Sequence, residues 1–577
     1  MPIVTSAEFL RREFDYLIVG GGTAGLAVAA RLTEDPDITV GVLEAGPIVD
    51  GDAAVSIPGC YGESLGTPLD WQFQTTPQPG LGGRVLNWPG GKVLGGSSAL
   101  NFMTWNRGNR EDYNAWEKLG NRGWGWNDLL PFFKKTEHFH PKGPRSQDEY
   151  QEHFDPRALG IDGPVQLSYA RQYSPSHKLW HETLNALGGR HEQAAPFGVE
   201  CRVVEEIELR PEGDEWAACG VKFKHENEQH SALALREVIL SAGSVQSPRL
   251  LELSGVGNPK ILSRAGIQTK VESPCVGENM QDHFMTAMIF EVDPTLENPD
   301  DLKFSADAKT AALDLYHKSQ TGPLTVLPCS ICYVPFQHFV PPETLAVAQA
   351  TIARIDGYSS EERSIRSQRF GPQARVGQIE YIFDLGNWNP FFKPQPLSGK
   401  KGSTHIKPAT PTDTGSTGIR QSGGVMGSPA IDPQYYCGQH GELDLELMVH
   451  CARFAHKICD AQPLASIIRS RASPPAVASQ STANGENNDD EAWRQWLREN
   501  TISDWHPVGT CAMGGRKGIE AGVVDARLRV YGVRRLRVVD ASVMPLQISA
   551  HLQATVYAIA EKGSSMILED RLPRRHV

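Results

Sequence analysis

A glycine-rich turn between an apolar run and a helical run constrains this chain more than any other feature. Residues 14–19 are mostly apolar and β-branched, which is typical of a buried strand. Gly20, Gly22 and Gly25 follow with the spacing G-x-G-x-x-G, and the Ala- and Leu-rich run 26–32 predicts a helix. Glycine permits the tight turn, and a helix N-terminus offers free N–H groups and a positive dipole end to phosphates. The sequence therefore predicts a dinucleotide-binding site.

An acidic residue completes this unit. Residues 38–43 predict a second strand, and Glu44 follows it roughly 20 residues beyond Gly25, where dinucleotide-binding folds place an acceptor for ribose hydroxyls. Two further strand-like runs, 238–240 and 536–539, also end in small residues. If these strands share one sheet, the domain is assembled from remote segments. FAD and NAD share this fingerprint, so the unit alone leaves the choice of dinucleotide open.

Composition narrows the choice of partners and compartment. The 577 residues carry 56 Lys and Arg against 68 Asp and Glu, a formal charge of −12, and no basic stripe, which argues against nucleic acid as a partner. No apolar run approaches the length of a membrane span, so we expect no membrane partner. Ten cysteines are too sparse for a disulfide scaffold, and the N-terminus lacks the apolar core of a secretory signal. These features predict a cytoplasmic enzyme, whose oligomeric state the sequence leaves open.

Three segments beyond the glycine turn carry a resemblance to a known family. They are a second glycine-rich loop at 90–101, the stretch 243–257, and residues 503–510 around Trp505-His506-Pro507. At these segments, and at 276–283 and 428–433, the chain resembles the glucose–methanol–choline (GMC) flavin oxidoreductases.

The resemblance implies an α/β fold, in which a Rossmann-like FAD-binding domain is interleaved with an α+β substrate-binding domain. The FAD-binding domain is predicted to comprise residues 1–165, 195–290 and 500–577, and the substrate-binding domain residues 166–194 and 291–499.

The same resemblance implies FAD as the cofactor. Thr23 and Ala24 would contact the pyrophosphate, Glu44 the adenosine ribose, and Val204 the adenine. The implied cofactor-binding residues are Gly20, Gly22, Thr23, Ala24, Gly25, Glu44, Ala45, Val93, Gly96, Asn101, Phe102, Met103, Thr104, Val204, Asp540, Ala541, Gln553 and Ala554. Some family members attach the flavin through a histidine at the position of Leu100, so we expect non-covalent FAD here.

Two histidines are the predicted catalytic residues. An alcohol does not ionise unaided near neutral pH, so a positioned base must take its proton as hydride leaves, and imidazole titrates in the required range. By resemblance His506 is this base and His551 holds the substrate oxygen. Relatives often carry proline after the second position, where this chain has Leu552. The expected reaction is oxidation of an alcohol to a carbonyl, with electrons passed to O₂ or a quinone-type acceptor.

Two other functions stay open at this stage. One is a non-redox lyase or cyclase on the same FAD scaffold, in which the histidine pair does acid–base work. The other is a protein that merely retains FAD. The substrate wall is expected from residues 324–336 and 386–392, whose apolar content favours an aromatic or bulky apolar alcohol. The stretches 397–427 and 470–490, rich in Gly, Ser, Thr and Pro, predict surface loops or locally disordered excursions.

Overall fold

The fold is described here from a computed structural model. It covers residues 4–141, 155, 157–170, 172–187, 204–225, 228–327, 330–374, 376–388, 400–408, 416–418, 428–474 and 489–571.

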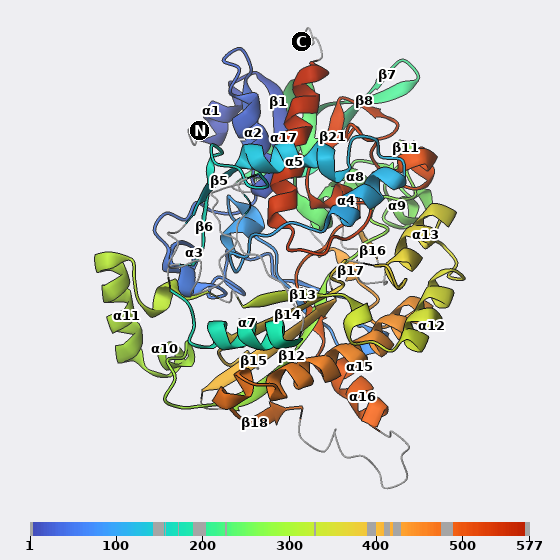
Figure 1. The fold of residues 1–577 in the computed structure, drawn as a ribbon. Coiled ribbons are helices and arrows are strands. Elements are labelled where there is room, and N and C mark those ends of the chain that lie inside the picture. The colour runs from blue at the N-terminus through green and yellow to red at the C-terminus, as the bar shows by residue number, and fades with distance from the viewer. Residues whose placement is uncertain are drawn as a thin grey trace.

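A parallel sheet forms the upper half of the molecule in Figure 1. Its strands are β2 (Val40–Leu43), β1 (Phe14–Val19), β9 (Glu228–Leu240) and β21 (Leu536–Val538), in that spatial order. Every residue of β1 is buried, as its apolar sequence predicts. Residues far apart in the chain thus share one sheet, and the carboxyl ends of its strands meet at one edge.

The long strand β9 continues this sheet into a mixed extension. Its first half pairs antiparallel with β8 (Glu215–His225), which also pairs antiparallel with β7 (Val204–Glu212) and parallel with β20 (Val533–Arg534). Helices α2 (Thr23–Leu32), α5 (Trp126–Thr136) and α17 (Gln553–Glu569) pack against one another over the parallel strands (Figure 1).

A second, antiparallel sheet forms the lower half. Its order is β13 (Ile331–Val334), β14 (Ile379–Leu385), β15 (Lys401–Pro408), β12 (Phe284–Val292) and β18 (Ile468–Ser473), and β19 (Ile502–Ser503) pairs with the start of β12. Helices α7 (Ser176–Leu187) and α15 (Gly438–Asp460) cover it, and α16 (Asp489–Asn500) packs on α15. The predicted domain limits stay predictions.

The other helices and strands are short or peripheral. They are α1 (Ser6–Leu10), α3 (Ala53–Ser56), β3 (Phe73–Gln74), β4 (Asn87–Trp88), α4 (Arg110–Lys118), β5 (Glu137–His140), β6 (Val165–Ser168), α8 (Gly243–Leu253), β10 (Val256–Gly257), α9 (Pro259–Arg264), β11 (Val271–Glu272), α10 (Asp300–Phe304), α11 (Ala306–Ser319), α12 (Pro342–Ile352), α13 (Ser360–Gln368), β16 (Ser416–Gly418) and β17 (Ala430–Asp432).

The expectation of surface loops at 397–427 and 470–490 is wrong in part. Strand β15 lies in the middle of the second sheet, and its residues 401–407 are buried. Successive residues of β15 face opposite sides of the sheet. Thr404 contacts Cys459 of α15, whereas His405 packs on the Trp388 ring. The sequence of β15 resembles that of a loop because one of the strand's two buried faces is polar. Strand β18 likewise extends into the second stretch, to Ser473.

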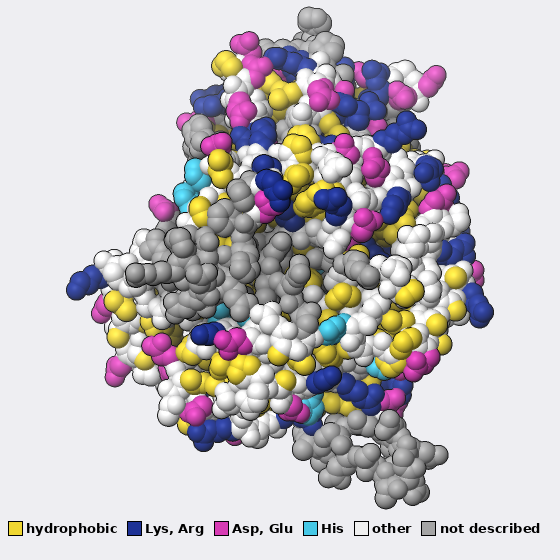
Figure 2. All heavy atoms as spheres, viewed as in Figure 1, with side chains coloured by type: hydrophobic (Ala, Val, Ile, Leu, Met, Phe, Trp, Pro, Cys, Tyr) yellow, Lys and Arg dark blue, Asp and Glu magenta, His cyan; other side chains and the backbone are white. Residues whose placement is uncertain are grey.

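The surface carries both charge signs. On the face in Figure 2, Lys and Arg side chains are interspersed with Asp and Glu, without a large area of one sign. Among the described residues, no helix combines the length and apolar character that crossing a bilayer requires.

Candidate active site

The glycine turn joins β1 to α2 through close backbone packing. Gly20 has φ +100°, and a Cβ there would lie 2.4 Å from the Ser241 carbonyl oxygen. A Cβ on Gly25 would lie 1.9 Å from the Gly20 carbonyl oxygen, so only glycine fits at that position. At Gly22, in contrast, the nearest atom to an added Cβ is 3.6 Å away. Helix α2 begins with no side-chain cap at Gly22, which leaves its first N–H groups available to an anion.

The second glycine-rich loop lies directly against the first. Gly95 donates its N–H to the Gly21 carbonyl (2.8 Å), and the hydroxyls of Thr23 and Ser98 are hydrogen-bonded. The Glu44 carboxylate, after β2, accepts the N–H groups of Gly21 (2.9 Å) and Gly46 (3.1 Å) and is nearly buried. The two loops and this carboxylate therefore form one unit.

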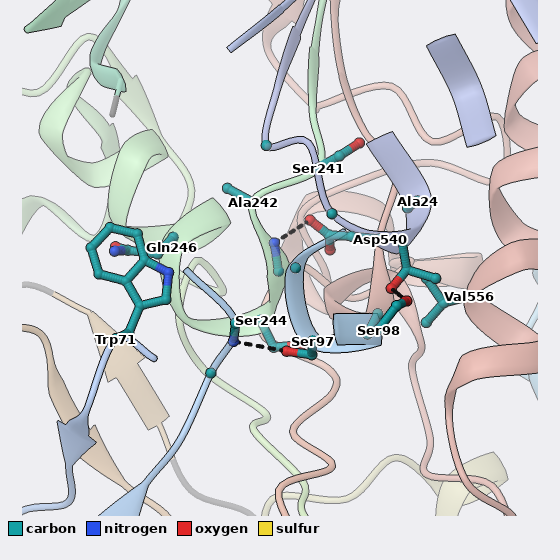
Figure 3. Close-up of a pocket in the computed structure, with 18 of the residues that line it drawn as sticks. Ala24, Trp71, Ser97, Ser98, Ser241, Ala242, Ser244, Gln246, Asp540 and Val556 are labelled. Atoms are coloured by element: carbon teal, nitrogen blue, oxygen red, sulfur yellow. Dashed lines mark hydrogen bonds between the residues drawn. The ribbon is translucent and has the colours of Figure 1, made fainter. Parts of the chain in front are cut away.

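A cavity of about 540 Å³ lies at this unit (Figure 3). All the predicted cofactor-binding residues line it except Gly25, Val93, Met103 and Ala554. Gly25 packs against the backbone of Gly20 instead. Val93 and Ala554 are buried, and the Met103 N–H donates to Asn101 Oδ1 (2.6 Å).

Several lining residues were not predicted. Trp71 and Gln246 lie on one side of the cavity in Figure 3, and Ser98 lies near Val556 on the other. Asp540, which was predicted, accepts hydrogen bonds from the Gly243 N–H (2.9 Å) and the Ser247 hydroxyl (2.6 Å). Gln246 lies in the stretch 243–257 that carries the family resemblance, whereas no pattern in the sequence links Trp71 to the glycine turn.

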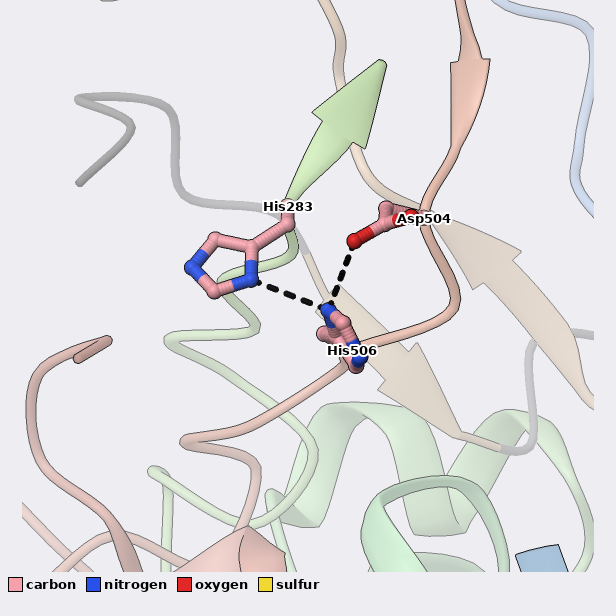
Figure 4. A group of neighbouring side chains, drawn as sticks. All are labelled: His283, Asp504 and His506. Atoms are coloured by element: carbon pink, nitrogen blue, oxygen red, sulfur yellow. Dashed lines mark hydrogen bonds and ion pairs between the residues drawn. The ribbon is translucent and has the colours of Figure 1, made fainter. Parts of the chain in front are cut away.

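Both predicted catalytic histidines line this same cavity. Their rings are 4.9 Å apart between centroids and nearly perpendicular. His506 Nδ1 lies 2.9 Å from Asp504 Oδ2 and 3.0 Å from His283 Nδ1 (Figure 4). His551 Nε2 lies 2.9 Å from Glu380 Oε1.

A lysine joins these side chains into one group, which we call the histidine cluster. Lys407 Nζ lies 2.9 Å from Asp504 Oδ2 and 3.2 Å from His551 Nε2, and it forms an ion pair with Glu380. The members of the cluster are His283, Glu380, Lys407, Asp504, His506 and His551.

A short segment, 281–283, positions the loop 503–508 that carries His506. Gln281 and Val508 form two reciprocal backbone hydrogen bonds, of 3.0 and 2.8 Å. The Asp282 carboxylate accepts the backbone N–H of His506 (2.7 Å) and the hydroxyl of Ser503 (2.7 Å). His506 is thus positioned by contacts to its main chain and to the loop around it.

The hydrogen bonds around His283 determine the tautomer of His506. His283 Nε2 lies 3.0 Å from the Ile548 carbonyl oxygen, which can only accept, so this nitrogen carries a proton. A neutral His283 then has a lone pair on Nδ1, which accepts from Nδ1–H of His506. Asp504 Oδ2 lies 2.9 Å from the same nitrogen, and its negative charge favours a proton at that position. The lone pair of His506 is consequently on Nε2.

Burial and charge set the protonation of the cluster. Burial lowers the pKa of His506 to about 4, although the adjacent Asp504 carboxylate opposes this. Burial alone would raise the pKa of Asp504 and of Glu380, but the Lys407 ammonium and the neighbouring imidazoles hold both well below their ordinary values. At neutral pH the His506 imidazole is therefore unprotonated, and the two carboxylates of the cluster are ionised.

His283, Asp504 and His506 are also residue types that bind metals, and their ligand atoms lie within 4.8 Å of one another. The Asp504 oxygen in question already pairs with the Lys407 ammonium, and the two imidazoles are hydrogen-bonded to each other. This arrangement is a proton-holding network rather than a vacant ligand set.

An aromatic cluster lies beside His506. Phe102 contacts the rings of Tyr61, Trp388 and Trp505 at centroid distances of 5.1–5.7 Å. Phe102 and Trp505 line the cavity. Of the predicted substrate wall, Trp388 thus reaches this cluster. Phe336 instead stacks on Phe370 in the core of the lower half, and residues 389–392 lie outside the described residues.

A parallel sheet with this glycine turn, and a cavity lined by both the turn and paired imidazoles, is typical of FAD-dependent oxidoreductases. The sequence matches the GMC oxidoreductase family over residues 14–197, 199–285 and 411–560. The chain belongs to this family, which confirms the predicted family and fold class.

Three similar proteins illustrate the relationship. The dehydrogenase citC of Monascus ruber is 34% identical, with 99% of this chain and 98% of the relative covered. An FAD-dependent oxidoreductase from Chaetomium thermophilum has a structure with TM-score 0.83 and 27% identity, covering 97% of this chain and 100% of that one. A fungal aryl-alcohol oxidase has TM-score 0.81 and 25% identity, with 97% and 100% covered.

These findings support FAD-dependent oxidation in general terms. The named relatives are oxidases, dehydrogenases and oxidoreductases, so the alternative of a lyase or cyclase is not favoured.

Proposed function

We propose that the protein oxidises an alcohol to a carbonyl with His506 as general base. The observation that carries this proposal is the placement of His506 Nδ1, 2.9 Å from Asp504 Oδ2 and 3.0 Å from His283 Nδ1. The Nδ1–H of His506 is engaged by Asp504 and His283, which leaves the Nε2 lone pair as the basic atom of a residue that lines the cavity. In the proposed reaction Nε2 takes the hydroxyl proton while hydride leaves the carbinol carbon.

His551 is proposed to hold the substrate oxygen. Its Nε2 is occupied by Glu380, so Nδ1 is the nitrogen that remains for a substrate. Its backbone N–H donates to Asn106 Oδ1 (3.0 Å), which fixes the turn before α17. The two rings are nearly perpendicular, and a hydroxyl that gives its proton to His506 Nε2 would need a donor, Nδ1–H, on His551 to hold its oxygen.

The residues around the cavity fit FAD. The uncapped N-terminus of α2 would bind the pyrophosphate, and the Glu44 carboxylate would accept from the ribose. When bound, FAD would supply the hydride acceptor. Leu100 is buried and offers no nucleophile, which supports non-covalent attachment. Acid denaturation of the purified protein should then release all of the flavin into the filtrate, and flavin retained on the polypeptide would contradict this part.

The substrate is proposed to be an aromatic or apolar alcohol. Phe102 and Trp505 supply aromatic surface in the cavity next to His506, and Tyr61 and Trp388 support Phe102 from behind. Such faces bind a planar ring better than a sugar, because they offer stacking area and few hydrogen-bond partners. A panel of benzylic, aliphatic and sugar alcohols, with H₂O₂ and dye reduction followed in parallel, tests both substrate class and the acceptor, O₂ or a quinone.

The decisive experiment is anaerobic mixing of holoenzyme with the best alcohol while the flavin absorbance is followed. The flavin absorbance of the wild-type protein should bleach. His506→Ala should retain FAD but reduce the bleaching rate by about 10²–10⁴-fold, the usual contribution of a general base. His317→Ala, on the exposed side of α11, is the matched control and should leave the rate unchanged. Near-normal bleaching in His506→Ala would mean that another group is the base.

A further inference from the structure

Lys407 is a buried cation at the centre of the histidine cluster. It lies on β15 directly opposite Glu380 of β14 in the antiparallel pair. Only 2% of its side chain is exposed. Its ammonium group contacts Glu380, Asp504 (2.9 Å) and His551 (3.2 Å). It therefore touches the partners of both catalytic histidines.

The charges in this cluster require such a cation. Asp504 pairs with His506, and Glu380 pairs with His551. Two buried carboxylates without a compensating charge would draw protons onto the imidazoles beside them, because a nearby negative charge favours the protonated form. A protonated His506 could not accept the hydroxyl proton. An ammonium between the carboxylates offsets this effect.

We propose that Lys407 is a positioning residue that keeps His506 unprotonated, by offsetting the charge of the two carboxylates that hold the catalytic histidines. The inference rests on the proposed function for its role in turnover, although the charge balance itself does not depend on the substrate. Lys407 acts through Asp504 and Glu380 and need not touch the reacting atoms.

The other titratable groups facing the cluster do not supply this charge. Burial lowers the pKa of His405, on the same strand, to about 4, so it is neutral near pH 7. Burial raises the pKa of Tyr333 of β13 well above its ordinary value. Asp282, behind His506, is an acid whose pKa burial raises to about 7, so it adds no positive charge. Burial opposes the charged form of Lys407, but Asp504 and Glu380 raise its pKa and keep it an ammonium.

The test measures the protonation of His506 in the holoenzyme. Histidine labelled with ¹³C at Cε1 is followed by NMR across pH, and the His506 signal is assigned by its loss in His506→Asn. In Lys407→Met the pKa of His506 should rise by about 1–3 units, the usual effect of an uncompensated neighbouring charge. Lys407→Arg retains the charge and should titrate close to wild type.

The same shift should appear in the rate of flavin reduction. In Lys407→Met the acidic limb of the pH–rate profile should move toward neutrality by the same amount, with activity recovered at higher pH. An unchanged His506 pKa in Lys407→Met would overturn the proposal. If no alcohol bleaches the wild-type flavin, the proposed function fails, but the comparison of Lys407→Met with Lys407→Arg by NMR still decides the role of Lys407.

A second pair of variants covers the case in which Lys407→Met does not fold. Lys407→Met/Glu380→Gln removes one charge of each sign, and Glu380→Gln alone is its reference. These two proteins differ only at residue 407, where one has the ammonium group and the other an uncharged side chain of similar length. His506 should take up its proton at higher pH in the double variant than in Glu380→Gln. Identical titration in the two would refute the inference.

Discussion

The glycine turn and three members of the histidine cluster, Asp504, His506 and His551, line one cavity, but the turn and the cluster are built in opposite ways. The turn uses backbone from one short segment, 20–25, together with the carboxylate of Glu44. The cluster uses side chains from five segments that lie as far apart in the chain as His283 and His551. Binding a phosphate needs N–H groups at a fixed turn, whereas proton transfer needs several titratable groups at fixed distances from one another. The first requirement can be met locally, and the second requires the tertiary fold.

The comparison predicts that the turn is intolerant of any added atom at one position. In Gly25→Ala, the new Cβ would lie 1.9 Å from a backbone oxygen, so α2 or β1 must move. We expect complete loss of FAD and a destabilisation of about 1–3 kcal/mol, as for other overpacked cores. Flavin absorbance per protein and thermal unfolding of the purified variants measure the two effects.

Gly22→Ala is the matched control for this prediction. An added Cβ has 3.6 Å of clearance there and the backbone φ is −80°, so the apoprotein should unfold at the wild-type temperature. Any loss of FAD in Gly22→Ala then reports contact with the cofactor alone. Full flavin occupancy in Gly25→Ala would show that the turn is not the rigid element we describe.

A smaller effect is expected where a side chain assists the turn. Glu44→Ala removes the acceptor for the Gly21 and Gly46 N–H groups and the proposed acceptor for the ribose. Hydrogen bonds to a charged group contribute about 1.5–3 kcal/mol, so the affinity for FAD should fall by about 10–100-fold. Titration of apoprotein with FAD measures this. The FAD affinity of Glu44→Gln, which retains one carbonyl oxygen, should lie between those of the wild type and Glu44→Ala. Glu13 is exposed, and Glu13→Ala should bind FAD as tightly as the wild type.

The same contrast explains what the sequence could and could not predict. The strand, turn and helix at 14–32 and the acid at Glu44 follow from local patterns, and the structure places them as expected, with α2 beginning three residues earlier, at Thr23. His506 and His551 were found only through a family resemblance. Their roles remain proposals, although both line the cavity.

Glu380 and Lys407 had no local signal. They oppose each other across β14 and β15, and that register exists only in the folded sheet. Lys407 lies within the stretch 397–427, which was expected to be a loop because it is rich in Gly, Ser, Thr and Pro. The only available signal was the alternation of residues along β15, since Thr404 and Ile406 face the core of the lower half while His405 and Lys407 face the site. A strand with a polar buried face has the composition of a loop, and composition alone cannot separate the two.

The smallest effect should come from changing His283, which is hydrogen-bonded to the proposed base, His506. In His283→Leu the second acceptor for His506 Nδ1–H is lost, while Asp504 remains at 2.9 Å. The tautomer should therefore be weakened rather than abolished, and flavin reduction should slow by about 10-fold, toward the low end of what outer hydrogen-bond partners contribute. FAD content should not change. His283→Gln can still accept through its amide oxygen and should recover part of the rate. Nitrogen-15 chemical shifts of His506 separate this role from a structural one, because loss of orientation mixes the Nδ1–H and Nε2–H forms. A slow His283→Leu enzyme whose His506 is still purely Nδ1–H would place the defect in packing and remove His283 from the proton-holding network.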